Sequence, residues 1–140
     1  MNELKIFYKN LSLGLFLLVV ISCSEKHTSD PIKTYQYWSN SDAPKEIKLI
    51  KGEYWQSSNW TNEYIMSLKL KPPGKWWDSF VEQNDLVPSK KEWTKPSGLA
   101  KWFKPSENSI EFKIEGEFDQ DSRYFCDYKT GICYIYEIQL

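Results

Sequence analysis

Histidine is almost absent from this chain of 140 residues, which has only His27, in a segment without apolar periodicity. Most zinc sites use histidine ligands, and Ser/His and Cys/His nucleophile arrangements need an imidazole to accept the proton. The sequence also lacks a Gly-rich phosphate loop and a Ser flanked as in a nucleophile elbow. We therefore expect no metal, no cofactor and no catalytic activity.

An excess of charge of either sign is also absent. Lys and Arg number 18 against 19 Asp and Glu, a formal net charge of −1, so no basic footprint favours nucleic acid as a partner. Five carboxylates cluster in the sequence. Glu111, Glu115 and Glu117 lie in a predicted strand, and Asp119 and Asp121 lie in a predicted turn. The three glutamates alternate with apolar residues, so we interpret them as a solvated face. The two aspartates lack the twelve-residue loop of a calcium site.

No apolar run is long enough to span a membrane as a helix. The longest, residues 11–22, reads LSLGLFLLVVIS. Twelve residues would cover about 18 Å of a bilayer core of roughly 30 Å. Lys5 and Lys9 precede the run and the small residue Ser22 ends it, an order typical of a secretory signal peptide. A transmembrane anchor is the alternative.

The end of this run resembles the lipobox of bacterial lipoproteins. In Val20-Ile21-Ser22-Cys23 an aliphatic residue stands three positions before the cysteine and a small residue directly before it. The resemblance covers residues 1–23 alone. It implies cleavage after Ser22 and a lipid on the Cys23 thiol, and two or three acyl chains anchor a protein stably. The alternative is a plain signal peptide that has Cys23 merely nearby.

The lipobox also implies a location in the cell envelope. Ser24, directly after the lipidated cysteine, resembles the residues that sort lipoproteins to the outer membrane, so we expect the outer rather than the inner membrane. The domain would lie in the periplasm or at the cell surface. Residues 23–34 show no apolar periodicity and are expected to form a flexible tether, followed by one folded domain over residues 35–140.

The periodicity of the remaining chain predicts a small α+β domain. Strand-like alternation marks residues 64–71, 110–114 and both arms of a C-terminal β-hairpin, with a weaker strand over Glu46–Ile50. Helical spacing of apolar residues over 75–84 indicates one main amphipathic helix. The sum is a mainly antiparallel β-sheet of about five strands with that helix packed against it.

The C-terminal hairpin carries two cysteines, Cys126 and Cys133. In an oxidising compartment such a pair favours a disulfide over free thiols or a metal site. If Tyr128 to Gly131 form a four-residue loop with Gly131 left-handed, the two cysteines fall directly opposite each other. A three-residue loop would put them out of register.

Aromatic residues are abundant, at 16% of the chain, and include seven Trp. Most can belong to the core, but Trp76, Trp77 and Trp102 form a candidate binding surface. Adjacent side chains on one helix point about 100° apart, so Trp76 and Trp77 cannot both be deeply buried.

We therefore expect a lipid-anchored, non-catalytic domain that binds a protein partner in the envelope. An immunity or inhibitor role would suit its small size and its anchor. The alternative is a glycan-binding module that uses exposed Trp side chains.

Overall fold

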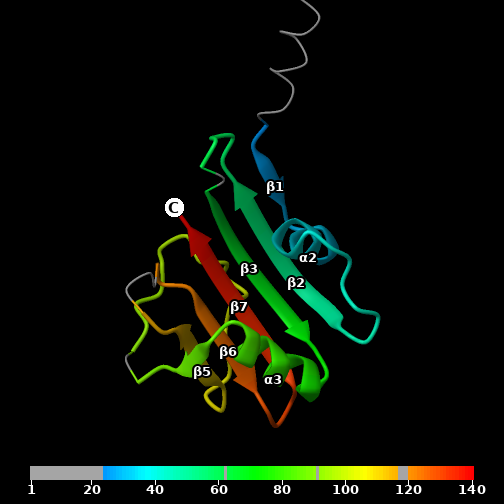
Figure 1. Cartoon of the computed structure of the whole chain (residues 1–140), viewed down its shortest axis with the longest axis vertical. Coiled ribbons are helices and arrows are strands. Elements are labelled where there is room, and N and C mark those ends of the chain that lie inside the picture. Colours follow the sequence, from blue (N-terminus) through cyan, green and yellow to red (C-terminus); the bar gives the residue numbers. More distant parts are fainter. Residues whose placement is uncertain (1–23, 62, 91, 117–119) are drawn as a thin grey trace, which may run out of the picture.

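A single antiparallel sheet of seven strands forms the framework of the computed structural model, which describes residues 24–61, 63–90, 92–116 and 120–140 (Figure 1). The elements in chain order are β1 (Lys26–Thr28), α2 (Pro31–Ser39), β2 (Lys48–Gln56), β3 (Tyr64–Lys71), α3 (Gly74–Gln83), β4 (Leu86–Pro88), β5 (Ile110–Ile114), β6 (Arg123–Asp127) and β7 (Ile132–Gln139). The strand order is β1-β2-β3-β7-β6-β5-β4, so β7 lies at the centre, between β3 and β6.

Both helices cover the same face of the sheet. Helix α2 contacts β2 and β3, and α3 places Phe80 5.7 Å from the ring of Tyr124 on β6. Beneath them Met66, Leu68 and Leu70 are fully buried, as the alternation of β3 predicts. The main core therefore lies between the helices and the sheet, and the helix predicted over 75–84 is confirmed as α3.

The segment between β4 and β5 covers the opposite face. Its described residues form neither helix nor strand, yet Trp93, Ala100 and Phe103 pack on Tyr134 and Tyr136 of β7. Both faces of β7 are consequently buried, and four successive residues from Cys133 to Tyr136 are inaccessible.

The α+β class and the antiparallel sheet are as expected, but the expected number of about five strands was too low. The two additional strands, β1 and β4, are the edge strands and have three residues each. Three residues are too few to display a hydrophobic alternation in the sequence. Short edges also limit pairing with other chains, because they offer few free backbone groups.

The N-terminal boundary at residue 35 and the single main helix were also wrong. Strand β1 pairs with β2 through Lys26↔Gln56 and Thr28↔Tyr54, and α2 begins four residues before the expected domain. Asp30 caps α2: its carboxylate accepts a 2.8 Å hydrogen bond from the backbone N–H of Ile32. The residues expected to form a tether therefore belong to the fold from Lys26 onward.

The apolar run and Cys23 lie outside the described residues. Within the described part of the chain, neither helix has the length and apolar character needed to cross a membrane.

Candidate functional site

The carboxylate of Glu137 on β7 accepts three side-chain hydrogen bonds from three different elements. Its Oε2 accepts one from Trp38 Nε1 of α2 at 2.5 Å and one from the Tyr64 hydroxyl of β3 at 2.9 Å. Its Oε1 accepts a 2.8 Å bond from the Tyr124 hydroxyl of β6. The half-buried carboxylate thus joins the helix layer to the central strand β7 and to the two strands that flank it.

Strand geometry explains why this carboxylate faces the core. Side chains alternate across a strand, so Glu137 points to the same face as Cys133 and Ile135, which are fully buried. Tyr64 and Tyr124 point to this face from the two neighbouring strands. Trp38 reaches it because α2 lies over the sheet, where its indole also contacts Phe80 of α3 at 5.9 Å between ring centres.

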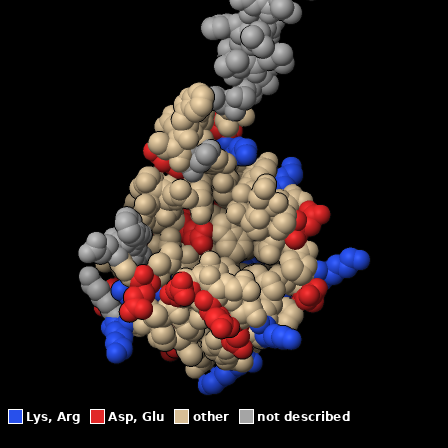
Figure 2. Space-filling view, viewed as in Figure 1, with Lys and Arg blue, Asp and Glu red and all other residues tan. Residues whose placement is uncertain are grey.

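A pocket of about 190 Å³ opens beside this carboxylate. It is lined by Tyr64, Ile114, Gln120, Ser122, Tyr124, Glu137, Ile138 and Gln139. Figure 2 shows acidic atoms inside a hollowed part of this face. We call this feature, meaning Glu137 with its three donors and the pocket, the Glu137 hollow.

Burial and the negative charge of Glu137 act together on the two tyrosines. Burial contributes most to raising the pKa of Tyr124 far above its ordinary value, and the charge of Glu137 and the hydrogen bond to it raise it further. The same causes, in the same order, raise the pKa of Tyr64. Both hydroxyls therefore stay protonated and donate to the carboxylate at any physiological pH.

All three donors to the Glu137 carboxylate are neutral groups. Among the described residues, no Lys, Arg or His lies within 4.0 Å of it as an ion-pair partner. Hydrogen bonds from neutral donors stabilise an ionised carboxylate but leave its charge in place. Within the described part of the chain, the charge of the hollow therefore has no ion-pair partner.

The carboxylates considered in the sequence have different surroundings. Glu111 is only partly solvated, because its side chain forms an ion pair at 3.3 Å with the buried Arg123. Glu115 and Asp121 are exposed, whereas Glu117 and Asp119 lie outside the described residues. In the described part of the chain, no group of three or more His, Cys, Asp or Glu could hold a metal ion.

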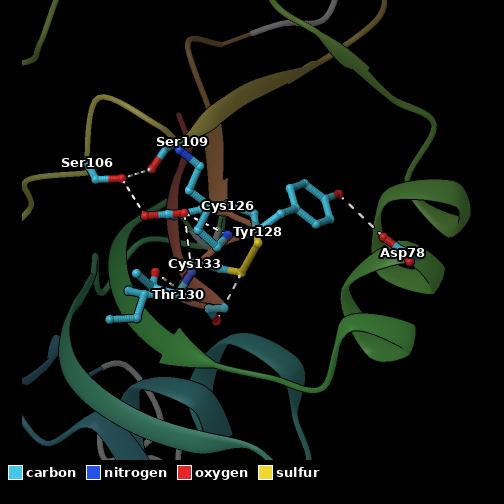
Figure 3. The surroundings of a disulfide bond; sticks show 11 residues. Asp78, Ser106, Ser109, Cys126, Tyr128, Thr130 and Cys133 are labelled. Atoms are coloured by element: carbon cyan, nitrogen blue, oxygen red, sulfur yellow. Dashed lines mark hydrogen bonds between the residues drawn. A yellow bond between two sulfur atoms is a disulfide. The ribbon is translucent and has the colours of Figure 1, made fainter.

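The structure places Cys126 and Cys133 directly opposite each other, with their sulfur atoms close enough for the predicted disulfide, which Figure 3 draws. Their Cα atoms are 4.1 Å apart. Asp127 pairs with Ile132, which leaves a four-residue loop, and Gly131 is left-handed with a φ of +72°. The four-residue loop and the register that it requires are as predicted from the sequence.

Asp127 organises this loop. One carboxylate oxygen accepts hydrogen bonds from the backbone N–H groups of Lys129 and Thr130, and the other accepts one from Ser106 at 2.8 Å (Figure 3). The hydrogen bond from Ser106 contributes most to holding the pKa of Asp127 below its usual value. The hairpin is thereby tied to the segment that precedes β5.

The structure does not bring Trp76, Trp77 and Trp102 together. Trp77 is 1% exposed and belongs to the core, whereas Trp76 is half-buried and stacks on Phe80 at 5.4 Å. Trp102 packs on the opposite face of the sheet, where its indole donates to Glu53 at 3.0 Å. The pair in α3 behaves as its 100° separation predicts, but the three residues form no common surface.

Comparison with known proteins adds no relative: no family model, curated protein or solved structure matches the chain. The geometry of the molecule itself must therefore carry any assignment of function. The Glu137 hollow was not predicted from the sequence, although Glu137 stands in strand alternation with the apolar residues Cys133 and Ile135.

Proposed function

We propose that this protein is a lipid-anchored envelope lipoprotein whose non-catalytic domain binds a protein partner through the Glu137 hollow. The lipobox Val20-Ile21-Ser22-Cys23 supports the anchor, and the outer membrane is the favoured site because Ser24 follows the cysteine. An immunity or inhibitor role against a toxin or an envelope enzyme suits a small domain held at a membrane. The observation that carries the proposal is the Glu137 carboxylate, which lies beside a pocket and has no ion-pair partner among the described residues.

The group that suits the hollow is a Lys or Arg side chain of the partner. A cation about 4 Å from a carboxylate gains about 4 kcal/mol near a protein surface, before the cost of removing both groups from water. Trp38 and Tyr64 are half-buried aromatic neighbours that add a favourable environment for a cation. Glu137 already has its three donors in place, so little of the site has to reorganise on binding.

The alternative function, glycan binding through Trp side chains, has weaker support. Sugar stacking needs an exposed indole face, and Trp77 offers none. Trp76 and Trp102 lie on opposite sides of the sheet, so one glycan chain cannot contact both without passing around the domain.

A titration observed by NMR separates the two functions. The full chain, labelled at tryptophan and held in detergent micelles, gives one indole N–H signal for each of seven Trp. Nα-acetyl-lysine amide and Nα-acetyl-arginine amide are expected to shift the Trp38 signal, which Trp38→Phe identifies, while Nα-acetyl-leucine amide leaves it in place.

Two carboxylate variants are matched controls for this titration. Glu137→Gln removes the charge of the hollow and is expected to abolish the shift. Glu53→Gln removes the carboxylate that Trp102 contacts on the other face, and the Trp38 response should persist. Shifts of Trp76 or Trp102 on addition of chitooligosaccharides, with Trp38 unmoved by the cationic probes, would favour the glycan function instead.

A further inference from the structure

Trp60 is the most exposed large hydrophobic side chain in the described part of the molecule, at 93% of its accessible surface. It lies between β2 and β3, in a hairpin whose arms are closed by a 2.9 Å hydrogen bond from the Ser57 N–H to the Glu63 carbonyl. An indole so exposed adds nothing to the stability of the core. Its apolar ring and polar N–H instead suit a contact in which one side is apolar and the other is wet.

The hairpin and the start of the described chain lie at the same end of the sheet (Figure 1). The register of β1 on β2 pairs Lys26 with Gln56, and the indole of Trp55 donates a hydrogen bond to the carboxylate of Glu25. Lys26 begins β1, three positions after Cys23, and Gln56 ends β2, four positions before Trp60.

Covalent geometry limits how far these two positions can separate. Cys23 precedes Lys26 by three residues, so its Cα lies within about 11 Å of that of Lys26. Trp60 follows Gln56 by four residues, and its Cα lies within about 14 Å of that of Gln56. A lipid on Cys23 would therefore hold this end of the sheet at the bilayer surface.

The chemistry of the hairpin suits the headgroup layer of a bilayer. Trp has an apolar ring and a polar N–H, and it is enriched where membranes meet water. Its exposed neighbours Ser58, Asn59 and Thr61 are polar and uncharged, so they can contact headgroups without the cost of burying a charge.

We propose that Trp60 inserts into the interfacial layer of the membrane that carries the lipid anchor, as a second contact that orients the domain. The inference rests on the proposed lipidation of Cys23. Two contacts at one end of the sheet restrict tumbling of the domain about the anchor, whereas a lipid on a loose tether would not. The occupant of the exposed indole is thus the bilayer, rather than a second copy of the chain or a protein.

The test uses the full lipidated chain in vesicles of phosphatidylethanolamine and phosphatidylglycerol with brominated acyl chains, which quench nearby indoles. The wild-type protein is expected to float with the vesicles and to show quenched tryptophan fluorescence. Trp60→Ala should float equally well and lose that quenching. Because the side chain is exposed, the substitution should leave the urea unfolding midpoint unchanged.

Tyr128→Ala is the matched control. Tyr128 is 51% exposed in the hairpin between β6 and β7, at the opposite end of the sheet (Figure 1), and its loss should leave the quenching unchanged. Equal quenching in the wild type and in Trp60→Ala would overturn the inference about Trp60. If both proteins still floated with the vesicles, the lipid anchor would nevertheless stand. Self-association of the wild type that is lost in Trp60→Ala, with no difference in quenching, would overturn it in favour of a second copy.

Flotation itself reports on the anchor. If the wild type and Cys23→Ala both failed to float, the lipid anchor would be disproved, and the inference that rests on it would fall too.

Discussion

The indole of Trp38 and the carboxylate of Glu137 are 99 positions apart in the sequence and are joined by a 2.5 Å hydrogen bond. The bond ties α2, the first helix of the described residues, to β7, the last strand. With the bonds from Tyr64 and Tyr124, it makes one carboxylate the meeting point of four elements. The candidate site and the link between the two ends of the fold are thus the same group.

Removing this carboxylate is expected to destabilise the fold. Glu137→Ala leaves the hydroxyl of Tyr124, which is 2% exposed, without its acceptor, at a cost of about 1–3 kcal/mol. Trp38→Phe removes one donor and should cost about 1 kcal/mol. Urea unfolding followed by circular dichroism measures both. A Glu137→Ala variant as stable as the wild type would show that the carboxylate does not organise the elements around it.

Docking of α2 on the sheet is tested at Gly52. An added Cβ there would lie 2.6 Å from the Thr34 Oγ1 and 2.7 Å from the Cα of Pro31, both in α2. Because backbone must move, Gly52→Ala should cost about 1–3 kcal/mol in the free energy of unfolding. Gly74→Ala is the control, since nothing lies within 4 Å of its added Cβ. Equal stability of the two variants would mean that residues 31–34 are a tether after all.

Alkaline pH should destabilise the protein in part through Tyr124, one of its buried tyrosines. The pKa of Tyr124 is raised in the folded state, so above about pH 10 the unfolded chain loses a proton that the folded chain keeps. The stability that Tyr124 contributes is fully present below that pH, and this contribution falls by up to about 1.4 kcal/mol per pH unit above it. Tyr124→Phe should lessen this slope in unfolding curves measured between pH 9 and pH 11. An unchanged slope would contradict the raised pKa.

The disulfide is expected to stabilise the fold modestly. Its cysteines are seven positions apart, and closing so short a ring contributes about 2–3 kcal/mol by the loop-entropy relation. A reductant should lower the thermal midpoint of the wild type and leave that of Cys126→Ala/Cys133→Ala unchanged. If the reductant left the wild type unaffected, the two cysteines would not be joined in the purified protein.

Local patterns predicted the elements that carry a strong repeat. Met66, Leu68 and Leu70 alternate over a full strand, and the spacing of Trp77 and Phe80 reports the helix α3. Gly131, placed in the left-handed position at the end of a four-residue loop, predicted that Cys126 and Cys133 lie directly opposite each other. In each case the information lies within ten residues of chain.

Other elements depend on contacts from distant residues. Strand β1 exists because β2 pairs with it, and three residues carry no period of their own. Helix α2 had a local signal, because Asp30 is a typical N-cap residue and Pro31 is favoured at the first helical position. The docking of the helix on the sheet, however, depends on the space left by Gly52.

The Glu137 hollow was hidden for a related reason. The sequence of β7 alternates on both faces, and only the segment from Trp93 to Phe103 explains why Tyr134 and Tyr136 are buried opposite the helices. If the covering segment is not known, the sequence predicts that Glu137 lies on the solvent-facing side of the strand. Its three donors come from residues 38, 64 and 124, which no local pattern could bring together.

The central claim is that this domain is held at a membrane by a lipid on Cys23, and metabolic labelling with a radioactive fatty acid tests it most directly. The wild-type chain, expressed in a bacterium that processes lipoproteins, should carry the label, and Cys23→Ala should carry none. Cys126→Ala/Cys133→Ala should be labelled like the wild type, because its N-terminal cysteine is intact. Equal labelling of the wild type and Cys23→Ala, or no label in either, would contradict the account.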